Sequence, residues 1–268
     1  MFKHLIFPAF AACIASGVNA HEFWIDPEAH MVAPDAPVVA RLRVGQEYVG
    51  GSMSYIPQRT RQFDVVVGGE MTEVAARMGD NPAFAQNFSD EGLVTIVHVT
   101  GDSFITWDDF SDFESFVVHK DAEWTLEEHE TRGLSRDDVT EVYSRYAKSL
   151  VAVGDGSGRD VEVGLLTEIT ALENPYTGET SDGIDVRLTY EGQARGDEQI
   201  EVFEKAPDET VAIFTVRTDA DGVVSVPVKP GHRYMLDAVV LREPGPEVDA
   251  DRGAVWESLW ANLTFMVP

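Results

Sequence analysis

The sequence predicts a mainly β protein built from two β-sandwich domains of the immunoglobulin or transthyretin kind, the first carrying an α-helical insertion. Two observations support this prediction. Short runs of β-branched and apolar residues, bounded by Gly, Asp or Pro, recur along most of the chain, and one long interval breaks that rhythm with helical spacing. The 268 residues are enough for two modest cores. We expect a first domain over residues 21–175, with its helical insertion at 108–148, and a second domain over residues 183–268.

The first twenty residues are typical of a secretion signal. A basic head with Lys3, an apolar run over residues 5–18 and small residues up to Ala20 predict cleavage after Ala20. We therefore expect an exported, periplasmic protein whose mature chain begins at His21. No later stretch approaches the ~20 apolar residues that span a bilayer, so we expect no membrane insertion after cleavage. Lipoprotein processing at Cys13 is the competing interpretation.

Strands and helices alternate with turns in the first predicted domain. The interval 108–148 is predicted to be helical because Phe110, Phe113 and Val117 recur at helical spacing. Residues 135–138 look like an N-cap box that opens a second helix toward the end of this insertion. Strands are predicted on either side of it, over residues 38–44, 63–67, 93–99, 149–153 and 163–170.

The second predicted domain packs six strands into fewer than ninety residues, a rhythm typical of a sandwich. Asp221-Gly222 has the composition of a hairpin turn. Asp237 interrupts an apolar strand, and we expect it to have a buried partner such as an arginine or backbone donors. The predicted strands are residues 184–190, 199–203, 211–218, 223–228, 234–241 and 263–267.

The charge excludes several functions. Asp and Glu number 47 against 20 Lys and Arg, which gives a formal charge of −27 at pH 7. Such a surface repels nucleic acid and anionic lipid. Cys13 is the only cysteine, so the mature chain has neither a disulfide nor thiolate chemistry. The sequence also lacks a nucleophile elbow, a phosphate-binding loop and a dinucleotide fingerprint.

Several separated stretches resemble, in family order, the bacterial family called domain of unknown function 4198. Its members are often labelled periplasmic components of nickel or cobalt uptake (NikM/CbiK-like). The resemblance covers nearly all of the mature chain and implies a periplasmic metal-handling role. The stretches that carry it are AHEFW at 20–24, LRVG at 42–45, HETRGL at 129–134, YSRYAKSL at 143–150, NPY at 174–176, TDADG at 218–222, PGHRY at 230–234 and WESLWANLTF at 256–265.

His21 is the most informative single position. After cleavage it offers a free α-amino group and an imidazole from one residue, and the two can close a chelate ring on one metal ion. The amine has an ordinary pKa near ~7.7, so a metal displaces its proton readily at neutral pH. With a second imidazole this would form a histidine brace, an arrangement seen in copper proteins.

Three other histidines are the predicted partners of His21. His119 lies opposite the aromatic stripe of its predicted helix and points toward solvent or a site. His129 lies in the family's HETRGL stretch among acidic residues, and His232 lies in a loop that leads into a strand. His98 and His30 are set aside, since the first alternates with apolar residues in a strand and the second has no supporting motif.

These nitrogen ligands favour a divalent transition metal, and nickel, cobalt and copper all stay open, with copper bound most tightly. The function predicted is a periplasmic metal-binding protein that supplies or buffers metal for uptake. Its partners would be the metal ion and an inner-membrane uptake transporter or an outer-membrane receptor, with no nucleic acid. A histidine-brace copper oxidase and a structural or adhesive β-sandwich module are the alternatives.

Overall fold

The computed structural model describes residues 21–248 and 250–268, and its strands form three sheets. The predicted signal segment, including Cys13 and the cleavage point at Ala20, lies outside the described residues. The first sheet has the order β1-β3-β4, with β7 pairing the other part of β3. Its strands are β1 (Glu22–Pro27), β3 (Pro37–Gln46), β4 (Val49–Met53) and β7 (Phe84–Asn87).

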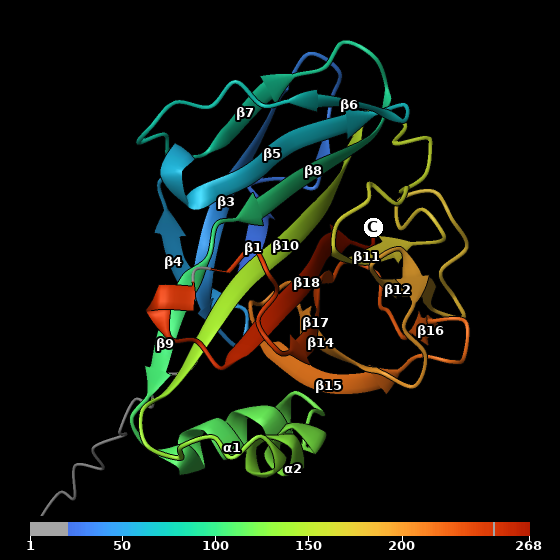
Figure 1. Ribbon diagram of the computed structural model, residues 1–268. Helices are drawn as coiled ribbons and strands as arrows, with labels where there is room; N and C mark the ends of the chain where they lie inside the picture. Colours follow the sequence, from blue (N-terminus) through green and yellow to red (C-terminus); the bar gives the residue numbers. More distant parts are fainter. Residues whose placement is uncertain (1–20, 249) are drawn as a thin grey trace, which may run out of the picture.

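The second sheet has ten strands and runs through the whole molecule (Figure 1). Its order is β15-β14-β17-β18-β10-β8-β5-β6, and two further strands, β2 and β9, pair with β10. The strands are β2 (Met31–Val32), β5 (Thr60–Val67), β6 (Glu70–Glu73), β8 (Gly92–Thr100), β9 (Ser103–Trp107), β10 (Val139–Val153), β14 (Gln199–Lys205), β15 (Val211–Arg217), β17 (Arg233–Arg242) and β18 (Trp256–Met266).

The third sheet is smaller and has the order β11-β12-β13, with β16 on the other side of β12. Its strands are β11 (Thr167–Ala171), β12 (Ile184–Tyr190), β13 (Gln193–Ala194) and β16 (Val223–Val226). Two short 3-10 helices, Pro57–Arg59 and Ala250–Arg252, complete the elements outside the α-helices.

Two sandwiches share the ten-stranded sheet. In the first, Ile25 and Leu42 of the first sheet pack against Phe63 and Ile96 of the large sheet. In the second, residues of β11, β12 and β16 pack against residues of β14, β17 and β18. The prediction of a mainly β, sandwich-like fold is therefore confirmed. The domain boundary predicted between residues 175 and 183 stays a prediction. Strands β10 and β18, one from each predicted domain, pair directly and in parallel, from Glu141 opposite Trp256 to Ser149 opposite Thr264.

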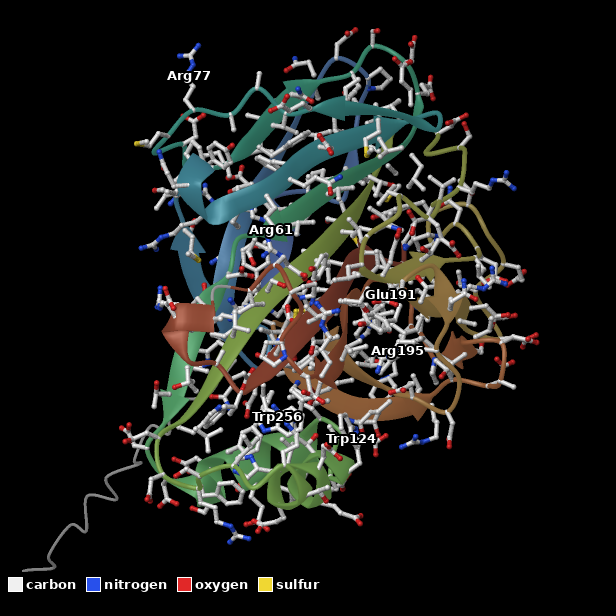
Figure 2. The ribbon with its side chains drawn as sticks, in the orientation of Figure 1. Arg61, Arg77, Trp124, Glu191, Arg195 and Trp256 are labelled. Atoms are coloured by element: carbon white, nitrogen blue, oxygen red, sulfur yellow. The ribbon has the colours of Figure 1, made fainter. Side chains whose placement is uncertain are left out.

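The two α-helices cover one end of the large sheet. They are α1 (Phe110–His119) and α2 (Trp124–Thr131). Helix α1 buries Phe113, Phe116 and Val117 among aromatic side chains of β9 and β18. Figure 2 labels Trp256 of β18 and Trp124 of α2, whose rings meet edge to face with centroids 6.0 Å apart. No helix in the described part of the chain is long and apolar enough to cross a membrane.

The prediction of helix over 139–148 is wrong, because these residues belong to strand β10. Asp138 has a φ of 54°, a left-handed conformation that cannot continue into an α-helix. The expected N-cap serves a turn instead, in which the backbone N–H of Asp137 donates to Ser135 Oγ. The sequence misleads here because β10 is buried on both faces, so its apolar residues do not alternate with polar ones.

The other predicted strands lie close to observed ones, with one shortened. The strand predicted over residues 163–170 begins only at Thr167. The backbone N–H groups of Val163, Gly164 and Leu165 donate to the carboxylate of Glu168 instead of to a neighbouring strand. A buried carboxylate that collects three backbone donors thus replaces the first half of the predicted strand.

Candidate functional site

His21 is held in place at the beginning of the described chain, immediately before β1. Its carbonyl oxygen accepts two hydrogen bonds from Arg145 of β10, at 2.6 Å from Nη2 and 3.2 Å from Nε. The next residue, Glu22, pairs with Gly45 of β3. His21 Nδ1 is buried and has no hydrogen-bond partner among the described residues. A buried nitrogen without a partner is costly, so this atom is a natural position for a ligand.

His21 and His119 line the same cavity, which has a volume of about 240 Å³. His21 directly precedes β1 and His119 is the last residue of α1, so the fold brings together two of the four predicted ligands. The cavity is lined by His21, Glu22, Gln46, Ser115, Phe116, His119 and Lys120.

His119 leaves one ring nitrogen available. Its Nε2 lies 3.1 Å from Oε1 of Glu201 on β14, and its side chain is 59% exposed. A carboxylate at one ring nitrogen orients the imidazole and keeps the other nitrogen, here Nδ1, as the electron-pair donor. The buried residues of α1 are Phe113, Phe116 and Val117, and His119 is not among them.

A buried lysine and three carboxylates lie next to this cavity. Lys120 Nζ is 2.8 Å from Glu201, 3.3 Å from Asp237 and 4.0 Å from Glu22. Its ammonium also lies over the ring of Trp260, 4.7 Å from the centroid. The group thus has three acidic side chains for one base, and a further cation near it would be attracted rather than repelled.

These carboxyl groups differ in their protonation. Burial, together with the charge of Asp237, raises the pKa of Glu22 to about 7. Burial also raises the pKa of Asp237. Although burial works against it, the hydrogen bonds from His119 and Lys120 lower the pKa of Glu201 to about 2. Glu201 therefore stays ionised at neutral pH and can hold the imidazole of His119.

His129 has a structural position that argues against its predicted role as a ligand. The residue is fully buried, its Nδ1 accepts a hydrogen bond from Trp256 Nε1 at 3.0 Å, and its Nε2 lies 3.0 Å from the carbonyl oxygen of Ser135. Both ring nitrogens are thus used inside the protein. We correct the prediction accordingly: His129 ties α2 to β18 and does not share the cavity of His21 and His119.

His232 is also separate from that cavity. Its Nδ1 lies 3.0 Å from the carbonyl oxygen of Pro230, and its Nε2 lies 3.8 Å from Glu204. Glu204 pairs with Tyr234, whereas Glu201 pairs with Asp237 three residues further along the same two strands. His232 therefore lies toward the other end of these strands, and the geometry favours His119 over it as the partner of His21.

The two histidines set aside from the sequence are interior residues. His98 and His30 are 2% and 4% exposed. Burial lowers the pKa of His98 to about 3 and that of His30 to about 4, so both are neutral at physiological pH. His98 Nε2 lies 3.2 Å from Thr60 Oγ1.

The sequence analysis missed Lys120 and Glu201. Asp237 has the buried partner that was expected, but the partner is Lys120 rather than an arginine. A signal was available, because Glu201 also interrupts an apolar strand and pairs directly with Asp237. Two acidic residues at matched places in adjacent apolar strands require a buried cation, and Lys120 supplies it.

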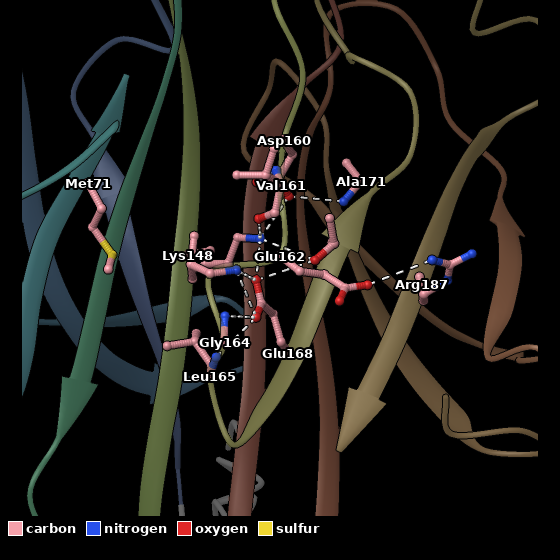
Figure 3. A network of polar contacts seen from close by, with 12 residues as sticks. Met71, Lys148, Asp160, Val161, Glu162, Gly164, Leu165, Glu168, Ala171 and Arg187 are labelled. Atoms are coloured by element: carbon pink, nitrogen blue, oxygen red, sulfur yellow. Dashed lines mark hydrogen bonds and ion pairs between the residues drawn. The ribbon is translucent and has the colours of Figure 1, made fainter. Parts of the chain in front are cut away.

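A second buried lysine, which belongs to none of the predicted sites, fixes the loop after β10 (Figure 3). Lys148 Nζ lies 2.9 Å from Asp160 and 2.9 Å from Glu168, and it also donates to the carbonyl oxygen of Val161 at 3.0 Å. All of its partners come from the segment between β10 and the end of β11. The network is fully enclosed and holds the two halves of the chain together.

Comparison with known proteins places the sequence in a family. The family described as Domain of unknown function (DUF4198) matches residues 18–242, which is well over half of the chain. The protein belongs to this family. No curated protein matches the sequence.

Two solved structures resemble this DUF4198 protein at low identity. The D0-D1 domain of intimin is 12% identical with a TM-score of 0.24, over 91% of this chain and 97% of that one. A tetra-tandem repeat in the extending region of a large adhesion protein is 12% identical with a TM-score of 0.20, over 92% of this chain and 49% of the other. Both likenesses are too distant to carry an argument about function.

Within the described residues of this DUF4198 protein, no group of three or more His, Cys, Asp or Glu side chains is arranged to hold a metal ion. A histidine brace does not need such a group. It uses two imidazoles and one backbone amine, and that amine exists only in a chain that starts at the first histidine. The donor atoms left available, Nδ1 of His21 and Nδ1 of His119, fit this kind of site.

Proposed function

We propose that the mature protein is an exported, periplasmic metal-binding protein that holds one nickel, cobalt or copper ion with His21 and His119. It would supply or buffer this ion for an uptake transporter of the inner membrane or a receptor of the outer membrane. The observation that carries the proposal is that these two histidines, far apart in the sequence, line one cavity while Nδ1 of His21 is buried without a partner.

The chemistry of the chelate supports this assignment. In a chain that begins at His21, the α-amino nitrogen, Cα, Cβ, Cγ and Nδ1 close a six-membered ring with a metal ion. The ring needs Nδ1, because Nε2 lies on the far side of the imidazole from the amine. Nδ1 is also the atom of His21 that lacks a partner. Nitrogen ligands of this kind favour copper, nickel and cobalt over calcium and magnesium.

The surroundings support a cation at this position. Arg145 fixes the carbonyl group of His21 through two hydrogen bonds, so the residue is already oriented. Glu201 orients the imidazole of His119 from the opposite side of the ring. The charge of the bound ion would be partly offset by the carboxylate of Glu201, which stays ionised at neutral pH.

The test is a titration of exported protein whose terminus is verified as His21. Calorimetry with copper(II), nickel(II) and cobalt(II) would compare this protein with one carrying an added Met before His21 and with His119→Ala. We expect each change to weaken binding by more than tenfold, which is ~1.4 kcal/mol. The added Met blocks the amine and leaves every side chain in place.

Matched controls come from two residues that lie outside the cavity, His232 and Asp112. His232→Ala, which removes an imidazole outside the cavity, should leave the affinity unchanged, and so should Asp112→Ala on the exposed face of α1. Equal affinities for the native and Met-extended proteins would remove His21 from the site and refute the proposal. Consumption of reductant by the copper-loaded protein would point to a copper oxidase instead of a carrier.

A further inference from the structure

A second cavity, of about 260 Å³, opens beside His21 and is distinct from the one shared with His119. It lies between the edges of the two sheets of the first sandwich, where β1, β3 and β4 face β8, β9 and β10. Phe23, Leu42 and Ile56 give it an apolar wall, and Arg59 and Arg145 also line it.

The charge of this second cavity is opposite to that of the molecule. None of the side chains that line it is Asp or Glu, although the chain carries a net charge of −27. Neither Arg59 nor Arg145 has a carboxylate within 4.0 Å among the described residues, whereas most arginines, such as Arg61 with Asp102, are paired. The cavity therefore concentrates unpaired positive charge on a strongly acidic protein.

Arg145 is built into the wall and is not a mobile surface side chain. It is 7% exposed, and its guanidinium lies over the ring of Tyr143, 4.4 Å from the centroid. Its Nε and Nη2 donate to the carbonyl oxygen of His21. Burial lowers the pKa of Arg145. A buried guanidinium without a carboxylate gains from an anion placed beside it.

The imidazole of His98 does not add to the positive charge of this cavity. His98 lines the cavity, and its imidazole is neutral because burial lowers its pKa to about 3. The hydroxyl of Thr60 donates to the carbonyl of Ile56, so it accepts from His98 Nε2. The imidazole of His98 therefore adds no charge at neutral pH, and the permanent positive charge of the cavity is that of the two arginines.

We propose that this cavity binds a small organic monocarboxylate with an apolar body, with the carboxylate between Arg59 and Arg145 and the body against Phe23, Leu42 and Ile56. The bidentate fork of an arginine matches a carboxylate, and an apolar wall rewards an apolar body. A volume of about 260 Å³ is just below the ~300–1,000 Å³ usual for ligand pockets, which limits the ligand to a small molecule.

The test uses ligands that share one body and differ in charge. Binding of 3-phenylpropionate, 3-phenylpropanol and 3-phenylpropylamine would be measured by calorimetry with excess chelator, and hexanoate would test an aliphatic body. We expect saturable binding of at least one acid, at least tenfold weaker binding of the alcohol and none of the amine. Binding of the alcohol as tight as that of the acid, or no binding of either acid, would overturn the proposal.

Two arginines of the same segment give matched variants. Arg59→Gln should weaken binding of the acid at least tenfold, while Arg61→Gln, whose side chain is paired with Asp102 outside the cavity, should change it less than twofold. An unchanged affinity in Arg59→Gln would contradict the assignment. Arg145→Gln is a second variant, with circular dichroism to verify its fold, and Arg59→Gln decides the matter if Arg145→Gln does not fold.

The outcome is separable from that of the metal proposal. A Met added before His21 should abolish tight metal binding and leave binding of the acid in place, because the arginines do not depend on the free amine. Arg59→Gln should weaken binding of the acid and leave metal binding unchanged. Loss of one kind of binding therefore says nothing against the other.

Discussion

Glu141 shows what burial does to a single carboxyl group in this fold. It is fully buried in β10, where Trp107 Nε1 donates to Oε2 at 2.9 Å and Ser258 donates to Oε1. Burial raises its pKa from 4.5 to about 7, although both hydrogen bonds work in the other direction. The side chain therefore keeps its proton in the folded protein at a pH where the unfolded chain has lost it.

This difference predicts a pH-dependent stability. Between pH 4.5 and about 7 the folded state binds one proton more than the unfolded state, so Glu141 makes the free energy of unfolding fall as pH rises, by ~1.4 kcal/mol per pH unit. Glu141→Gln removes the titration. We expect the stability of this variant relative to the native protein to rise with pH at about this slope up to pH ~7 and to level off above it.

Urea unfolding at pH 5, 6, 7 and 8 measures this slope. Glu162→Gln is the control, since Glu162 lies on the surface and its ion pair with Arg187 is exposed. A stability difference between Glu141→Gln and the native protein that does not change with pH would show that Glu141 is ionised inside the fold.

The candidate metal ligands show how far residue-level prediction reaches. His21 could be singled out from the cleavage signal alone, and His119 from its place opposite an apolar stripe. His119 and His129 both lie in the last turn of a short helix with acidic residues nearby, so the sequence gives no means of separating them. What separates them is the partner across the fold: Trp256 binds His129, whereas Glu201 holds His119 at a cavity.

At the scale of elements, the docking of the helix pair depends on His129. Its Nδ1 accepts the indole N–H of Trp256, and its ring also packs near Phe110 and Phe113. We expect His129→Leu to destabilise the protein by about 1–3 kcal/mol in urea unfolding, because it leaves the buried indole N–H without an acceptor. The affinity for metal should stay unchanged, since His129 lies outside the cavity.

A double variant tests the physical reason. Trp256→Phe removes the donor, so adding it to His129→Leu should cost less than it does in the native protein. Strictly additive costs would show that the hydrogen bond is unimportant and that ring packing alone holds the helices. A loss of metal affinity in His129→Leu would restore His129 as a candidate ligand.

Strand β10 shows why one element escaped prediction. Short strands such as β12 alternate buried and partly exposed residues and are therefore visible in the sequence. Strand β10 is central and buried over almost its whole length, and it carries Lys148 and Glu141 inward. Its polar residues look like the exposed side of a helix, and only their partners in β9, β11 and β18 show that they are interior.

At the scale of the whole molecule, the sandwich-like packing could be predicted from the sequence, whereas the strand pairing that joins the two sandwiches could not. Sandwich-like packing follows from strand rhythm, which is local. The parallel pairing of β10 with β18 joins residues more than a hundred positions apart, and local patterns carry no information about such a contact. The same applies to Lys148, whose carboxylate partners are Asp160 in the glycine-rich loop and Glu168 in β11.

This join predicts a single cooperative unfolding transition. The ten-stranded sheet passes through both halves, and the enclosed Lys148 network links β10 to β11 (Figure 3). We expect hydrogen exchange of β3 and of β12 to report the same midpoint in urea. Lys148→Met should lower the free energy of unfolding reported by β3 and by β12 together, by about 3–5 kcal/mol, because it leaves Asp160 and Glu168 buried without a cation.

Lys229→Met is the matched control, since Lys229 is 64% exposed and its ion pair with Glu204 should contribute less than ~1 kcal/mol. Adding Asp160→Asn to Lys148→Met should recover part of the loss, because it removes one of the unpaired charges. If β12 instead exchanged at lower urea than β3, each sandwich would carry its own stability and residues 175–183 would mark a true domain boundary. A common midpoint means that the Lys148 network and the β10–β18 pairing make the two sandwiches one folding unit.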